Sequence, residues 1–166
     1  MSNVLVVSYS LGGTTRVVAD EIATALSADT HEIQEARKRS GMMQYFLAGL
    51  ESLAKGLPAI RSDCDPGGYE LVVLGTPVWA GSMASPMRSF LFSNHGKINN
   101  VACFCTMGGR GAEGTLQEMQ LLSGAEKAIS YSAREADVHN GAYRPGLEEF
   151  IAALKRASEG AVTAVA

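Results

Sequence analysis

The hydrophobic pattern of the chain alternates between short apolar runs and longer stretches with helical spacing. Five short runs rich in apolar and β-branched residues predict strands, and most of them are nearly continuous, as is typical of strands covered on both faces. The second run is more polar and suits a sheet edge. The five predicted strands span residues 3–10, 30–36, 69–75, 100–106 and 127–133.

Helical spacing fills the stretches between these runs. Val18, Ile22 and Leu26 predict one face of a helix that begins at Thr14 or Thr15. Proline near the start of a helical pattern, or just beyond its end, marks two further boundaries at Pro86 and Pro58. The remaining predicted helices span residues 42–57, 86–94, 115–122 and 145–157, and a tail over 158–166 is expected to be frayed.

Strands that alternate with helices predict an α/β fold, in which a parallel sheet carries helices on both faces. We expect a three-layer αβα sandwich with five parallel strands in the order 2-1-3-4-5. In that order the first, third and fourth strands are neighbours, and the switch point lies between the first and the third. Ligands of such sheets bind beyond the carboxyl ends of the strands at the switch point.

The length and composition fit one folded domain over residues 1–166. A net charge of -3 and the lack of a basic stripe argue against a nucleic-acid partner. No run reaches the roughly 18 apolar residues of a membrane span, and the N-terminal run lacks the basic flank of a signal peptide, so a cytoplasmic location is expected. Cys103 and Cys105 share one face of a predicted strand and are expected to be core residues, with no metal site.

Three unusual loops follow the first, third and fourth predicted strands: "SLGGTT" (10–15), "TPVWAGSMA" (76–84) and "TMGGRGAEG" (106–114). The first has glycines, hydroxyls and a helix start, which suit an anion. It lacks the lysine of a nucleoside triphosphate loop and the G-x-G-x-x-G of a dinucleotide fold. A single phosphate monoester fits best, and a glycine-eased turn with a threonine cap is the alternative.

Taken together, the three loops resemble those of flavodoxin-like proteins. "VVSYSLGGTTRVVADEIA" is similar to the family's Y-S-x-T-G-N-T loop, with Gly12 and Thr14 in place of Thr and Asn. "YELVVLGTPVWAGSMASPMRSFL" is similar to the third strand and the loop that holds the ribityl chain and ring, and "FCTMGGRGAEG" to the third flavin loop. The match extends over residues 3–155 and includes "ADVHNGAY" before the last helix.

This resemblance implies FMN as the cofactor and three sets of binding residues. The phosphate set is Ser10, Gly12, Gly13, Thr14 and Thr15. The set along the ribityl chain and isoalloxazine is Thr76, Pro77, Val78, Trp79 and Gly81. The set at the polar edge of the ring is Thr106, Met107, Gly108, Gly109 and Gly111, with Arg110 as a tuning residue.

The kind of redox chemistry depends on the third loop. It contains no aromatic residue, and the net charge is mild, which favours an oxidoreductase over a one-electron carrier. A cation at Arg110 would stabilise an anionic reduced flavin. We therefore expect a two-electron oxidoreductase that uses NAD(P)H and a small quinone-like acceptor. An Arg110 that points into solvent, and a carrier with a redox partner protein, are the alternatives.

Other readings are also open. Arg16 could assist the phosphate or lie in solvent, and the basic residues 37–39 could meet a cofactor phosphate or form a solvated loop. A hydrolase based on Ser8 or Ser10 lacks the G-x-S-x-G motif. A non-catalytic flavin-binding or docking module, dimerising through residues 42–57, is a further alternative.

Overall fold

The computed structural model describes residues 2–36 and 54–163, and the side chains of 159–163 are not considered. Its main sheet contains the parallel strands β1 (Val4–Ser8), β2 (Asp29–Glu32), β5 (Leu71–Trp79), β7 (Val101–Met107) and β8 (Ile129–Arg134) in the order β2-β1-β5-β7-β8. This is the predicted 2-1-3-4-5 order, so the predicted fold class is confirmed. The helices are α1 (Thr14–Leu26), α3 (Ser85–Ser93), α4 (Ala112–Ser123), α5 (Glu135–Asn140) and α6 (Arg144–Thr163).

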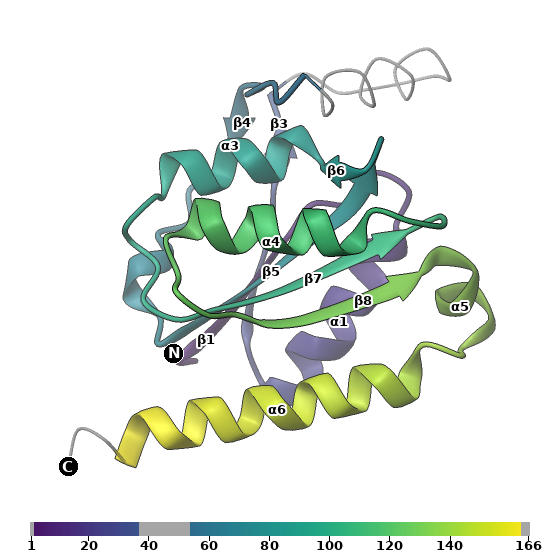
Figure 1. Cartoon of the computed structure of the whole chain (residues 1–166). Helices are drawn as coiled ribbons and strands as arrows, with labels where there is room; N and C mark the ends of the chain where they lie inside the picture. Colours follow the sequence, from purple (N-terminus) through teal and green to yellow (C-terminus); the bar gives the residue numbers. More distant parts are fainter. Residues whose placement is uncertain (1, 37–53, 164–166) are drawn as a thin grey trace.

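The helices form two layers, one on each face of the sheet (Figure 1). α3 and α4 cover one face, and α1 and α6 cover the other. Because alternate residues of a strand point to opposite faces, Val4 and Val6 of β1 pack under α1 and α6, while Leu5 and Val7 pack under α3 and α4. The near-continuous apolar strands are therefore explained by two cores, one in each helical layer.

Two of the predicted strands differ from the strands in the structure. The prediction that the third strand ends at Gly75 is wrong, because β5 runs on to Trp79 and pairs antiparallel with β6 (Ser82–Met83). Ala80 and Gly81 both have positive φ, 50° and 80°, as a two-residue hairpin turn of type I′ requires. The predicted second strand is divided: β2 ends at Glu32, and β3 (Gln34–Glu35) pairs instead with β4 (Ile60–Arg61).

The helical regions also hold differences. α4 begins at Ala112, three residues before the predicted start, and the expected frayed tail is helical from residue 158 to Thr163. The short helix α5 was not predicted as a helix, and the turn cluster before β5 contains a 3₁₀ helix, η1 (Pro66–Gly68). The basic residues 37–39 and residues 42–53 of the predicted helix over 42–57 lie outside the described residues. The prediction is wrong for residues 54–57, where 54 and 55 form a turn and 56 and 57 have no regular structure.

The two cysteines of β7 lie in the core, as predicted. Cys103 and Cys105 are fully buried on β7, and burial raises the pKa of each thiol to about 12. None of the helices in the described part of the chain is long and apolar enough to cross a membrane.

Candidate flavin site

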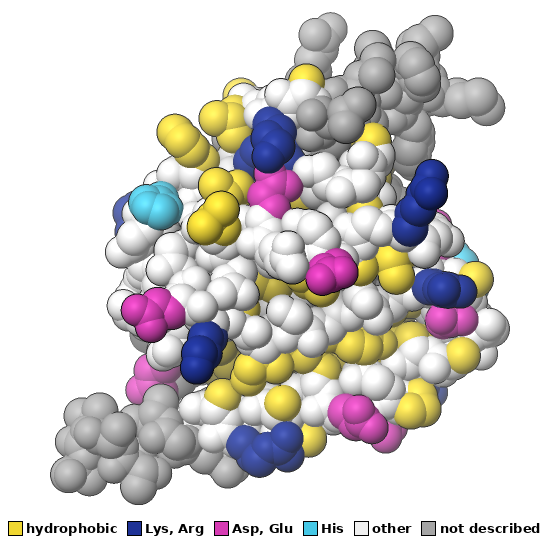
Figure 2. Space-filling model, in the orientation of Figure 1, with side chains coloured by type: hydrophobic (Ala, Val, Ile, Leu, Met, Phe, Trp, Pro, Cys, Tyr) yellow, Lys and Arg dark blue, Asp and Glu magenta, His cyan; other side chains and the backbone are white. Residues whose placement is uncertain are grey.

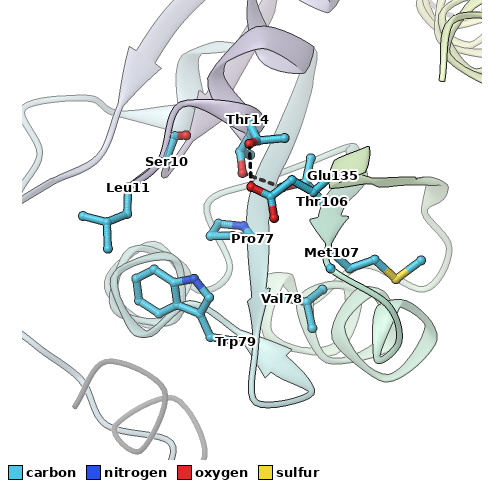
Figure 3. Close-up of a pocket in the computed structure, with 12 residues that line it drawn as sticks. Ser10, Leu11, Thr14, Pro77, Val78, Trp79, Thr106, Met107 and Glu135 are labelled. Atoms are coloured by element: carbon cyan, nitrogen blue, oxygen red, sulfur yellow. Dashed lines mark hydrogen bonds between the residues drawn. The ribbon is translucent and has the colours of Figure 1, made fainter. Parts of the chain in front are cut away.

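The sheet order brings the ends of β1, β5 and β7 to one edge, and the loops that follow them surround a pocket. The pocket has a volume of about 230 Å³. Figure 3 shows Leu11 and Trp79 on one side of it, Val78 and Met107 on the other, and Pro77 between them. Its lining residues are Ser10, Leu11, Gly12, Thr14, Thr15, Pro77, Val78, Trp79, Thr106, Met107, Gly108 and Glu135.

One end of the pocket is built from the start of α1. Gly13 precedes the helix with φ of 93°, a left-handed conformation that favours glycine, and no side chain caps the helix. Thr14 and Thr15, the first residues of α1, line the pocket, so this end contains an uncapped helix N-terminus of the kind that binds anions. The Gly13 amide donates to Ser10 Oγ at 3.1 Å, so the Ser10 hydroxyl hydrogen can still be donated to a ligand.

A buried hydroxyl pair fixes this end of the pocket to the sheet. Thr15 Oγ1 and Thr106 Oγ1 lie 2.7 Å apart, and both residues are buried. The pair joins the first turn of α1 to the end of β7, two segments separated by 91 residues in the sequence. This hydrogen bond thus fixes the position of the loop after β1 relative to the loop after β7.

The other end of the pocket is apolar and contains Trp79. The indole packs edge-on against Tyr9, with ring centroids 5.5 Å apart and an interplanar angle of 85°. The Tyr9 hydroxyl in turn donates to Glu35 Oε1. Trp79 is half-buried, as are Pro77 and Val78 of the same strand. A flat aromatic ligand is the shape that suits such a wall.

A close glycine contact joins the two loops at the apolar end. Gly111 has φ of 100°, and a Cβ atom placed there would lie 2.8 Å from Gly81 Cα and 3.0 Å from Val78 Cγ1. The loop after β7 can therefore approach the β5–β6 hairpin this closely because position 111 is glycine, whereas a Cβ at Gly81 would meet no protein atom within 4 Å.

Buried polar residues hold the β5–β6 hairpin from behind. Arg88 on α3 donates to Ser82 Oγ at 2.7 Å and forms an ion pair with Glu118 on α4 at 3.3 Å. Burial opposes ionisation of Glu118, but the hydrogen bonds from Ser82 and Arg88 and the charges of Arg88 and Lys55 outweigh it, so the pKa of Glu118 is lowered. The Ser82 end of the hairpin is thereby tied to two helices.

Several predicted site residues lie beside the pocket rather than on its wall. Thr76 is fully buried, and its hydroxyl accepts from the Ala84 amide and donates to the Pro77 carbonyl. Arg110 is exposed at the tip of its loop. The predicted residues outside the lining set are Gly13, Thr76, Gly81, Gly109, Arg110 and Gly111.

Two lining residues, Leu11 and Glu135, were missed by the sequence-based prediction. Glu135 is the first residue of α5 and follows β8, the fifth parallel strand, at the same edge of the sheet. Thr14 Oγ1 donates to Glu135 Oε1 at 3.2 Å, which places the carboxylate at the hydroxyl-rich end (Figure 3). The signal in the sequence was an acidic residue directly after β8, whose carboxyl end lies at the same edge as those of β1, β5 and β7.

The described donors suit a ligand with one anionic group and one flat apolar part. The hydroxyl-rich end offers Ser10, Thr14 and the amides of α1, and the apolar end offers Trp79. A Cβ atom at Gly12 or Gly108 would meet no protein atom within 4 Å, so protein packing does not account for glycine at either wall position. A phosphate monoester attached to an aromatic ring system fits this donor set.

Comparison with known families identifies the class of protein. A family model described as flavodoxin matches residues 3–142, most of the chain. The chain therefore belongs to the flavodoxin family. A search of curated proteins found no match.

Solved structures agree with this fold. The chain is similar to a flavoprotein from Lactobacillus acidophilus solved in complex with FMN, with 21% identity, a TM-score of 0.65, and coverage of 84% of this chain and 98% of that one. The chain is also similar to a flavoprotein described as putative from Bacteroides eggerthii, with 21% identity, a TM-score of 0.66, and coverage of 84% of this chain and 95% of that one. A third similar structure is oxidised flavodoxin 2 from Bacillus cereus, with 19% identity, a TM-score of 0.53, and coverage of 92% of this chain and 97% of that one. At these identities the likeness shows the fold.

Proposed function

We propose that this member of the flavodoxin family is an FMN-binding redox protein, and more specifically a two-electron oxidoreductase that acts with NAD(P)H and a quinone-like acceptor. The observation that carries the proposal is that the start of α1 and the Trp79 wall lie at opposite ends of the same pocket. One matched structure of the same fold contains FMN.

The chain's residues would hold FMN by its two unlike ends. Ser10, Thr14 and the α1 amides would bind the phosphate, and Trp79 with Pro77 would pack against the ring system. The flavin supplies hydride and electron chemistry when bound. The protein orients it and excludes water from its apolar side.

The preference for two-electron chemistry rests on the loop after β7. This loop offers Gly108, Gly109 and Arg110 and no aromatic side chain, so Trp79 is the aromatic residue among the described pocket-lining set. On the face shown in Figure 2, acidic and basic side chains are interspersed and form no acidic surface of the kind that carriers present to partner proteins. Arg110, which is exposed two residues after the lining residue Gly108, would supply a cation near the expected polar edge of the ring.

The first experiment is an absorbance spectrum of the purified full chain, with and without added FMN. A bound flavin spectrum is expected, and a chain that neither contains nor takes up FMN would refute the proposal. It would then be a docking module, the alternative in which a homodimer is also expected.

A second experiment separates enzyme from carrier. The holoprotein is expected to oxidise NAD(P)H in steady state when a quinone is present. An anaerobic reductive titration is expected to proceed directly from oxidised to fully reduced protein. A titration dominated by a stable half-reduced form, with no NAD(P)H turnover, would instead identify a one-electron carrier that serves a redox partner protein. Replacement of Arg110 by Gln is expected to lower the two-electron potential.

A further inference from the structure

We infer that Glu135 is an anionic competitor inside the phosphate end of the pocket, which limits the preference of this protein for FMN over riboflavin. The inference rests on the proposed flavin binding and adds a residue that sets specificity at that site. The Glu135 carboxylate lies at the end of the pocket whose other residues suit an anionic ligand.

The hydroxyl of Thr14 already has an acceptor in this structure. A threonine hydroxyl has one hydrogen, and in this structure Thr14 Oγ1 donates it to Glu135 Oε1 at 3.2 Å. A phosphate that binds at the start of α1 needs that same hydrogen. The carboxylate therefore has to give up its bond to Thr14 before the phosphate can receive one.

The negative charge of Glu135 would also repel a bound phosphate. The side chain of Glu135 is 54% exposed, and the basic group recorded beside it is His139, whose Nε2 lies 3.8 Å from Oε1. No Lys or Arg forms an ion pair with Glu135 among the described residues. A phosphate monoester at this end thus meets a carboxylate that has no Lys or Arg partner among the described residues, and the repulsion lowers its affinity.

FMN and riboflavin would differ only at the end of the pocket that holds Glu135. Figure 3 shows the Glu135 carboxylate near Thr14 and Thr106, while Trp79 lies across the pocket. Riboflavin has the same ring but a neutral terminal hydroxyl, which can donate to a carboxylate. Removal of the charge should therefore strengthen FMN binding and leave riboflavin binding nearly unchanged.

The test measures dissociation constants for FMN and riboflavin by quenching of flavin fluorescence, using the full chain freed of flavin by dialysis. Glu135→Gln is expected to tighten FMN binding about tenfold, because it removes one charge beside a dianion in a largely aqueous setting and frees the Thr14 hydroxyl hydrogen for the phosphate. Riboflavin binding should change less than about twofold. Asp137→Asn is the matched control, because it removes one charge from the same short helix at a residue that does not line the pocket.

A second pair of variants tests the competition for the hydroxyl. In a Thr14→Val background the gain from Glu135→Gln should shrink, since no hydroxyl remains to be released. Unchanged or weaker FMN binding by Glu135→Gln overturns the inference, as does an equal gain for riboflavin or an undiminished gain in Thr14→Val. If the unmodified chain binds FMN while the variant shows no gain, the inference alone fails. If neither binds FMN, the proposed function fails with it.

Discussion

The two ends of the pocket are held in place by different means. The hydroxyl-rich end, where the phosphate of the proposed FMN would bind (the phosphate end), is formed by Ser10, Gly13 and Thr14, which are close together in the sequence, and one buried hydroxyl pair joins it to β7. The apolar end, where the flavin ring would bind (the ring end), depends on residues that are distant in the sequence. Its hairpin, which carries Trp79, is held by Arg88 and Glu118 and by contact between Gly81 and Gly111. Local sequence thus specifies the anion-binding end, whereas tertiary packing specifies the ring end.

The largest expected effect is at the ring end, from Arg88→Met. The Arg88 side chain is 5% exposed, and its replacement leaves Glu118 with Ser82 and the exposed Lys55 as its recorded partners. Breaking a buried ion pair costs about 3 kcal/mol of unfolding free energy. Urea unfolding measures the cost, and Trp79 fluorescence is expected to shift because the hairpin loosens.

Lys55→Met is the control for Arg88→Met. Lys55 contacts the same carboxylate at 3.4 Å, but its side chain is 70% exposed, so the expected loss is below about 1 kcal/mol. Equal losses in the two variants would show that the buried cluster has no special role in holding the hairpin.

The second effect tests the contact between the two ring-end loops through Gly111→Ala. The new Cβ would lie 2.8 Å from Gly81 Cα at a position with φ of 100°, so a loss of about 2 kcal/mol is expected, together with weaker FMN binding. Gly109→Ala is the matched control because a Cβ there meets no protein atom within 4 Å. Thermal unfolding with and without FMN measures both, and a stable Gly111→Ala that binds FMN normally would contradict the loop contact.

The third effect tests the phosphate end through Thr15→Val. This change leaves the buried Thr106 hydroxyl without its partner and should cost about 1 to 2 kcal/mol. Thr115→Val makes the same chemical change at a buried hydroxyl that has no hydrogen-bond partner among the described residues, and it should be nearly neutral. Urea unfolding compares them. A larger loss for Thr115 would reverse the proposed importance of the two hydroxyls.

The smallest effect is a pH dependence at the ring end. The pKa of Glu118 is lowered in the folded chain, so its ionisation contributes stability above its unfolded pKa, and this contribution is lost as pH falls through the folded pKa. The stability difference between the unmodified chain and Glu118→Gln should therefore shrink in acid, by about 1 kcal/mol or less. Urea titrations at pH 6 and pH 3 measure it. A difference that grows in acid would contradict the lowered pKa.

The same contrast explains what the sequence could predict. Strand order and the three pocket loops follow from hydrophobic runs and from glycines beside hydroxyls, which are local signals. The approach of Gly111 to Gly81 and the Arg88–Glu118 pair join segments about 30 residues apart, and nothing in the local pattern pairs them. Glu135 was missed because its importance comes from its position at the same sheet edge as Thr14, 121 residues away.

The open positions in the loop after β7 make this protein a convenient starting point for redesign. Gly108 and Gly109 are exposed, neither has positive φ, and side chains there would extend into free space. Because Gly108 lines the pocket, an aromatic residue introduced there would add an aromatic side chain to the pocket wall without a clash at its Cβ. The loop therefore accepts directed substitution at the pocket while the sheet and both helical layers stay the same.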